Sequence, residues 1–190
     1  MQKRHRIFIA INLPEDVKRE LAKYQEKWPE LPAKWIDKDQ LHITLEFLGD
    51  LTDIEVGDVC RITGEVVKRH KAFNLDLNKI IYGPPKKLPP KMIWVEGEKS
   101  DDLKDLKEDL QECLLEEIRF RPEGRGFTPH ITLSRISEWE FRKIEPEERP
   151  EVNEGVSFFV PVESIEVMES ELKRGGPVYT ILESFPLSDL

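Results

Sequence analysis

Apolar and polar positions along the chain follow two rhythms, and each rhythm predicts a different element. Short runs rich in β-branched and aromatic residues, at 7–12 and 41–49, predict strands of a buried sheet. Apolar residues at helical spacing predict a helix that begins after Pro14 and ends near Trp28, and a second helix over about 52–70. The chain therefore begins with strand, helix, strand and helix, in that order.

The remainder of the chain continues this order and then repeats it. Residues 73–82 predict one or two strands with a turn near Asn78, and a proline-rich connector follows. The second series consists of a strand at 92–95, a helix capped by Ser100, a strand at 130–136, a short helix after Ser137, and strands around 156–167 and 178–182.

The spacing of the two series indicates a duplication. Phe8 and His42 are 34 residues apart (42 − 8). Trp94 and His130 are 36 residues apart (130 − 94). Similar units in the same order are the signature of an internal repeat. We expect one bilobal domain over 1–190, with repeat one at about 6–82, a connector at about 83–90 and repeat two at about 91–182.

This pattern predicts an α+β fold built from two similar lobes. Each lobe would be an antiparallel sheet with helices on its outer face, because each helix and each sheet must bury one apolar face against another element. A pseudo-twofold axis would relate the lobes, and a central cleft would lie between them. The chain has 190 residues, which suits one domain or two small lobes.

Charge and cysteine content limit the classes of function. The net charge is 29 − 38 = −9, so the chain lacks the basic surface of a general nucleic-acid binder, although a small site for a nucleic-acid end remains possible. The longest apolar runs have about five residues where a membrane helix needs about 20, so we expect no membrane contact. Cys60 and Cys113 are far apart and form no CxxC motif, which favours reduced thiols and a cytoplasmic location.

The candidate chemistry lies in a tetrapeptide that occurs twice, at 42–45 and 130–133, with the sequence His-Ile-Thr-Leu. Side chains alternate along a strand, so the histidine and threonine of each copy share the face opposite to the isoleucine and leucine. Histidine is the side chain best suited to move protons near neutral pH. Two such strands would supply a base, an acid and hydroxyl donors, which is the set that displacement at a phosphodiester needs.

Other interpretations of the two histidines remain open. A single His-x-Thr in a strand is incidental in most proteins, but two copies in matching surroundings are harder to explain by chance. A catalytic zinc needs three protein ligands, and the chain has no His-x-His or HExxH motif, so we expect no metal. The chain could also be a non-catalytic module that binds RNA ends or nucleotides. It could, finally, act on small cyclic nucleotides.

These residues resemble the paired motifs of the two-histidine (2H) phosphoesterase superfamily, and within it the RNA 2′,3′-cyclic phosphodiesterases, also called 2′-5′ RNA ligases. The resemblance covers nearly the whole chain. It rests on a first strand at 6–11, an extended first motif at 41–49, a second motif at 127–135 and a C-terminal stretch at 169–172 and 176–179.

The resemblance implies hydrolysis of a 2′,3′-cyclic phosphate to a 2′-phosphomonoester, without a metal or any other cofactor. Reversible 2′-5′ joining of RNA ends is also implied. By similarity, His42 would be the proton donor and His130 the proton acceptor, while Thr44, Thr132 and Arg135 would bind the phosphate. The substrates would be RNA ends or tRNA fragments that carry the cyclic phosphate, or small cyclic nucleotides. We expect the chain to act as a monomer.

One of these residues conflicts with strict strand alternation. Arg135 is five positions after His130, so alternation places it on the face of Ile131 and Leu133, away from the histidine. Its role in phosphate binding therefore requires a bulge, a twist or the end of the strand between them.

Overall fold

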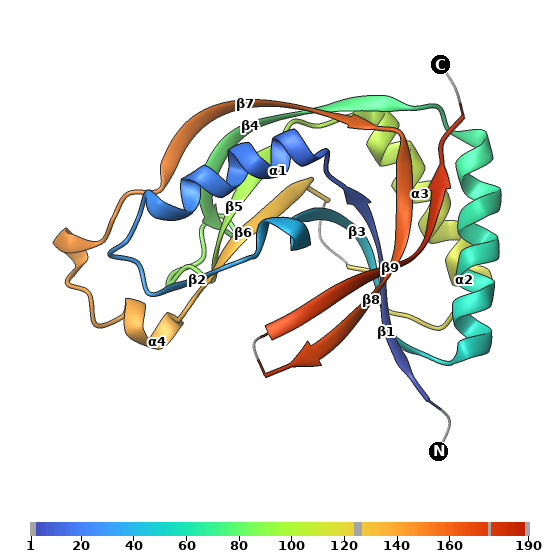
Figure 1. The fold of residues 1–190 in the computed structure, drawn as a ribbon, viewed down its shortest axis with the longest axis horizontal. Helices are drawn as coiled ribbons and strands as arrows, with labels where there is room; N and C mark the ends of the chain where they lie inside the picture. Colours follow the sequence, from blue (N-terminus) through green and yellow to red (C-terminus); the bar gives the residue numbers. More distant parts are fainter. Residues whose placement is uncertain (1–2, 124–126, 175, 189–190) are drawn as a thin grey trace.

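The structure is a computed structural model that describes residues 3–123, 127–174 and 176–188. In these ranges the named strands form one sheet in the order β7-β4-β5-β6-β3-β1-β8-β9, with β2 beside β6. The loop before the second motif contains Gly124 and Gly126, which lie outside the described residues. Figure 1 shows the sheet bending around the molecule, with α2 and α3 together on one side and α1 in front of the strands.

Apart from the short strand β2, which lies in a segment expected to be a loop, the strands agree with the predicted ones in place and order. Their bounds are β1 His5–Asn12, β2 Ala33–Trp35, β3 His42–Leu51, β4 Phe73–Gly83, β5 Met92–Gly97, β6 His130–Ile136, β7 Asn153–Val162, β8 Ser164–Lys173 and β9 Gly176–Pro186. Every pairing between them is antiparallel. The prediction of an α+β fold with antiparallel sheets is confirmed.

Three of the named α-helices begin where a side-chain oxygen accepts from one of their first N–H groups, whereas the first α-helix begins after Pro14 without such a cap. The α-helices are α1 Glu15–Ala22, α2 Asp53–Val66, α3 Asp101–Glu117 and α4 Glu138–Phe141, and the short 3₁₀ helices are η1 Lys23–Glu26, η2 Lys38–Gln40, η3 Val67–Arg69 and η4 Pro146–Glu148. Thr52 and Glu55 form a capping box at the start of α2, and Ser100 caps α3 by accepting from the Leu103 N–H. No helix in the described ranges is both long and apolar enough to cross a membrane.

Two of the predicted elements have a different form in the structure. The first helix ends at Ala22 and continues only as the 3₁₀ turn η1, and the indole of Trp28 instead donates to the carbonyl of Glu151 at 3.2 Å. Residues 73–83 form one strand, without a turn at Asn78. A shift of register between Leu77 and Lys79 takes the place of that turn, which is how a β-bulge absorbs an extra residue without ending the strand.

The two halves of the chain exchange strands. β4, from the first half, pairs with β5 of the second half, while β8, from the second half, pairs with β1 of the first. The two halves meet directly where β3 pairs with β6, at Ile43 opposite Ile131. One apolar cluster extends through both halves and buries one face of α2 and of α3. Because each lobe contains strands from both halves, neither half of the chain forms a lobe by itself.

Candidate active site

A β-bulge lies inside each copy of the repeated motif. In β3, Thr44 is opposite Ala10 and Glu46 is opposite Ile9, so Leu45 has no partner on β1. In β6, Thr132 is opposite Trp94 and Ser134 is opposite Ile93, so Leu133 has no partner on β5. These are the fourth residues of the two motifs, and they occupy equivalent positions in the sheet.

The bulges change which side chains face the cleft. Leu133 and Ser134 are both buried, and alternation resumes with Arg135 exposed on the side of His130 and Thr132. The bulge in β3 has the same effect, because it places the side chain of Phe47 on the face of the strand that carries His42 and Thr44. The conflict between strand alternation and a site role for Arg135 is thus resolved by the local geometry, because an extra residue reverses the facing of the residues that follow it.

The imidazole of His42 is held at both ring nitrogens. Its Nδ1 donates to the carbonyl of Gln40 at 2.8 Å, and its Nε2 is 3.1 Å from Oγ1 of Thr44. The ring contacts Phe8 and Tyr179, with centroid distances of 5.1 and 4.9 Å. Because a carbonyl can only accept, the neutral ring carries its hydrogen on Nδ1, and Nε2 is left with the lone pair.

The imidazole of His130 has the same local support. Its Nδ1 donates to the carbonyl of Thr128 at 2.9 Å, which again lies two residues earlier in the chain. Its aromatic neighbour is Trp94 on β5, at a centroid distance of 4.0 Å. Thr132, two residues further on, has its hydroxyl 3.9 Å from the sulfur of Met92. In both neutral rings, Nε2 is therefore the nitrogen that carries the lone pair.

Burial lowers the pKa of both histidines. The pKa of His42 falls to about 4, chiefly because burial penalises the charged ring, and nearby Lys18, His130 and Arg135 lower it further. Burial likewise lowers the pKa of His130 below its usual value. Both rings are consequently neutral at pH 7 in the free protein. A bound anion would favour the charged form, since it opposes the positive groups that act on His42.

A single cavity of about 650 Å³ brings the predicted site residues together. It is lined by all five of them: His42, Thr44, His130, Thr132 and Arg135. Four aromatic residues that the sequence did not single out for the site, Phe47, Trp94, Phe127 and Tyr179, also line it. Tyr179 is tied to the first motif, because its N–H donates to the side-chain oxygen of Gln40 at 2.6 Å.

The charged groups near the cleft differ in their surroundings. Glu46, which is 2% exposed, accepts from the amine of Lys107 at 2.7 Å, so its charge is compensated inside the protein. The same amine lies 5.1 Å from the ring centroid of Phe127, another cleft residue. Glu46 therefore adds little net negative charge to the cavity, which the carboxylate of Glu123 and the guanidinium of Arg135 also line.

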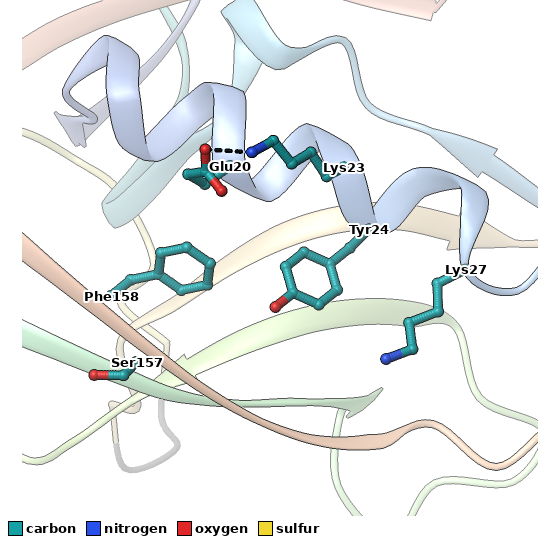
Figure 2. A pocket seen from close by; sticks show the side chains of 6 residues that line it. All are labelled: Glu20, Lys23, Tyr24, Lys27, Ser157 and Phe158. Atoms are coloured by element: carbon teal, nitrogen blue, oxygen red, sulfur yellow. Dashed lines mark hydrogen bonds and ion pairs between the residues drawn. The ribbon is translucent and has the colours of Figure 1, made fainter.

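A second cavity, of about 510 Å³, lies between the α1–η1 segment and β7 (Figure 2). Its lining consists of Glu20, Lys23, Tyr24, Lys27, Ser157 and Phe158. Lys23 points toward Glu20 and binds it at 2.5 Å (Figure 2), and Lys27 pairs with Glu154. None of the predicted site residues lines this cavity, and its lining contains no imidazole, so it offers no group suited to proton transfer near neutral pH.

The other two histidines have structural partners outside the cleft. His5 lies 2.7 Å from Glu169 and 2.9 Å from Asp53, and His70 lies 2.8 Å from Asp109. Within the described ranges, no group of three or more histidine, cysteine, aspartate or glutamate side chains is arranged to hold a metal ion.

Comparisons with known proteins show which family the chain resembles over most of its length. A family model described as LigT like Phosphoesterase matches twice, at residues 11–94 and 96–179. An RNA 2′,3′-cyclic phosphodiesterase of Thermus thermophilus is 34% identical over 188 residues, which cover 96% of this chain and 90% of that protein. One from Methanocaldococcus jannaschii is 28% identical, covering 95% of this chain and 99% of that protein.

Solved structures show the same architecture. The crystal structure of TT0787 of Thermus thermophilus has a TM-score of 0.82 at 31% identity, and the match covers 96% of this chain and 97% of that one. The crystal structure of E. coli LigT complexed with 3′-AMP has a TM-score of 0.77 at 24% identity, covering 98% and 99%. The two-lobe fold predicted from the sequence is thereby confirmed.

Proposed function

The chain belongs to the LigT-like phosphoesterase family, and from this membership we propose that its central cleft hydrolyses 2′,3′-cyclic phosphates at RNA ends with two histidines as acid and base. The observation that carries the proposal is the pairing of β3 with β6, which brings both His-Ile-Thr-Leu motifs to one cavity. The protein is accordingly an enzyme, a phosphodiesterase, as its relatives named RNA 2′,3′-cyclic phosphodiesterase indicate.

The register of the two strands suits an in-line displacement. Ile43 is opposite Ile131, so extending the antiparallel register by one residue places His42 across from Thr132 and Thr44 across from His130. Each imidazole therefore has a hydroxyl beside it on its own strand and another on the neighbouring strand. A phosphorus between the strands could have one Nε2 near the attacking water and the other near the leaving oxygen.

In the proposed step, Nε2 of His130 accepts a proton from water while the water oxygen bonds to phosphorus. The bond between phosphorus and the 3′-oxygen breaks, and His42 gives its Nε2 proton to that oxygen. His130 gains one proton and His42 loses one, so the net charge of the histidine pair does not change. The product is a 2′-phosphomonoester with a free 3′-hydroxyl. The assignment of donor and acceptor follows from family resemblance alone, since both imidazoles donate through Nδ1 to the carbonyl two residues earlier and this contact is the same for the two.

Substrate binding is part of this mechanism because the free protein keeps His42 neutral. Its pKa of about 4 leaves it without the proton that a donor needs at pH 7. The negative phosphodiester would oppose the fields of Lys18 and Arg135, which lower that pKa in the free protein. Arg135 and the hydroxyls of Thr44 and Thr132 would bind the non-bridging oxygens, where charge increases in the transition state.

The experiment is a substrate panel with identification of the product. Equal concentrations of a 2′,3′-cyclic mononucleotide and of a short RNA with a 2′,3′-cyclic end are incubated with the protein in excess EDTA, and the position of the phosphate is determined. We expect turnover of both and a 2′-phosphate product. Binding without turnover would reject the enzyme in favour of a binding module, and loss of activity that zinc or manganese restores would reject the metal-free reaction.

Two further arms of the panel separate the substrate classes. Faster turnover of the mononucleotide than of the RNA would indicate an enzyme of small cyclic nucleotides, which the net charge of −9 keeps in consideration. Incubation of the RNA with a second RNA that ends in a 5′-hydroxyl tests the reverse reaction, in which a hydroxyl replaces water as the attacking group. A 2′-5′-linked product would show that the same cleft also joins ends.

A further inference from the structure

Trp94 is the aromatic residue most closely associated with a proposed reacting group. Its ring centroid is 4.0 Å from that of His130, with the two planes inclined by 50°. The indole is 7% exposed, so its surface is nearly all in contact with protein. Trp94 is opposite Thr132 in the sheet, whereas the corresponding residue opposite Thr44 in the other half is Ala10. The large ring is thus particular to the His130 side of the cleft.

The backbone of the neighbouring strand fits closely against this indole. A Cβ placed on Gly83 of β4 would lie 2.4 Å from Cδ2, 2.5 Å from Cε2 and 2.9 Å from Cε3 of Trp94. Real Cβ atoms do not approach other atoms so closely, so any residue other than glycine would displace the ring. The backbone at Gly83 does not have a positive φ, so the glycine is required for the space it leaves.

The indole also carries a cost to stability that a plain apolar ring would not carry. Its Nε1–H is buried and has no hydrogen-bond partner among the described residues. A buried donor without a partner destabilises a fold, and a phenylalanine would fill an apolar site without that cost. A tryptophan under these conditions is better explained by what its shape does for its neighbour.

We propose that Trp94, seated on Gly83, is a positioning residue for His130. This proposal deepens the proposed function and rests on it, because it names what orients the proton acceptor. The hydrogen bond from Nδ1 to the carbonyl of Thr128 restrains one side of the imidazole, and the indole restrains its tilt. Together they direct Nε2 toward the cavity. Misplacement by about 1 Å at a reacting group can cost about 100-fold in rate, so this restraint matters for catalysis.

The test compares two variants of the contact with a matched control. Gly83→Ala pushes the indole, and Trp94→Leu removes it. Gly155→Ala is the control, because a Cβ there meets no atom within 4 Å and Gly155 lies on β7, also beside β4. With a 2′,3′-cyclic mononucleotide, we expect kcat to fall at least about tenfold in both variants, with KM within about twofold of the parent protein. The control should retain the kcat of the parent.

Three results would overturn the proposal. A rise in KM at unchanged kcat would show that Trp94 contributes to substrate binding and does not position His130. A kcat in both variants equal to that of the Gly155→Ala control would leave the contact without a function. The third result concerns the combined variant Gly83→Ala with Trp94→Phe. Because the smaller ring should relieve part of the clash with the new Cβ, the loss of kcat in this variant should be less than the product of the losses in the two single variants. A loss equal to that product would count against the proposal.

A spectroscopic measurement keeps this test independent of the proposed reaction. A charged imidazole quenches the fluorescence of an indole in contact with it, so emission from Trp94 should follow the titration of His130 in the parent protein. His130→Asn should abolish that titration step and Gly83→Ala should weaken it. If the parent protein does not hydrolyse cyclic phosphates, the proposed function fails while the titration still reports on the contact. If the step persists unchanged in Gly83→Ala, the positioning role fails while hydrolysis stands.

Discussion

The two walls of the cleft are built alike up to the bulge and differently after it. On both walls, a histidine donates through Nδ1 to the carbonyl two residues earlier, and a threonine follows two residues later. After the unpaired leucine, one wall has Glu46 and Phe47 where the other has Ser134 and Arg135. The shared residues are the ones that the proposed proton transfer needs, while the exposed residues that differ, Phe47 and Arg135, would set how a substrate is oriented.

Because of this difference, the two walls of the cleft offer different groups to a bound molecule. The rings of Phe8 and Tyr179 contact the imidazole of His42, and Phe8 also contacts the ring of Phe47. On the opposite wall, His130 has Trp94 beside it and the guanidinium of Arg135 on the same face. A molecule with an apolar ring at one end and a phosphate at the other therefore has a preferred orientation across the two walls.

The largest loss of activity is expected from removing the histidines that the two walls have in common. His42→Ala and His130→Ala should each lower kcat by roughly 10²- to 10⁴-fold, the usual contribution of one positioned acid or base. The double variant should lose less than the product of the two losses, since the two residues act as a unit. Steady-state kinetics would measure this, with His70→Ala as a control outside the cleft. Full activity in either single variant would reject the two-histidine mechanism.

The buried polar residues that follow the two bulges, Glu46 and Ser134, should differ in their contribution to stability. Lys107→Met leaves Glu46 charged and unpaired in the interior, which should cost about 3 kcal/mol of unfolding free energy. Ser134→Ala should be neutral or slightly stabilising, because the Ser134 hydroxyl is buried with no partner among the described residues. Urea denaturation would compare them. Similar losses in both variants would show that the two sites are energetically equivalent.

The exposed residues after the bulge should separate charge from stacking. Arg135→Met should lower kcat/KM by roughly 10- to 100-fold, because a charge-assisted contact to phosphate is worth about 1.5–3 kcal/mol. Phe47→Leu should have a smaller effect, of about threefold and mainly on KM, since it removes only a ring contact. Kinetics with a cyclic mononucleotide would decide. If Phe47→Leu were the more damaging change, the proposed orientation of the substrate would be reversed.

The smallest effect concerns the pH profile. The active form needs one neutral and one charged histidine, and both pKa values lie below 6.5 in the free protein. We therefore expect kcat/KM to have its maximum on the acidic side of pH 6.5 and to decline as pH rises, since the charged partner loses its proton.

A substitution of Lys18 should shift the pH profile of kcat/KM. Its charge lowers the pKa of His42, so Lys18→Met should raise that pKa and increase kcat/KM about threefold at pH 7, by restoring some of the charged form. Lys23→Met is the matched control, because Lys23 is paired with Glu20 in the other cavity. A profile that moves toward lower pH in Lys18→Met, or moves equally in the control, would contradict the role assigned to Lys18.

Much of the site could be predicted from sequence because its determinants are local. The capping residues Thr52 and Ser100 act within one turn of their helices, and strand alternation places His42 with Thr44 whatever the rest of the chain does. The turn expected near Asn78 was wrong for a related reason. Both a turn and a bulge interrupt alternation, and only pairing with β5 and β7 determined that β4 continues through it.

The sequence by itself determined the order of the elements, the two motifs and the pairing of histidine with threonine on one face, since each depends on residues within a few positions of one another. The tertiary structure decided the rest. Three features depend on residues distant in sequence: the exchange of β4 and β8 between the two halves of the chain, the position of Arg135 in the cleft, and the contact of Trp94 with His130. The lowered histidine pKa values also come from burial, which exists only once both lobes have closed around the same cavity.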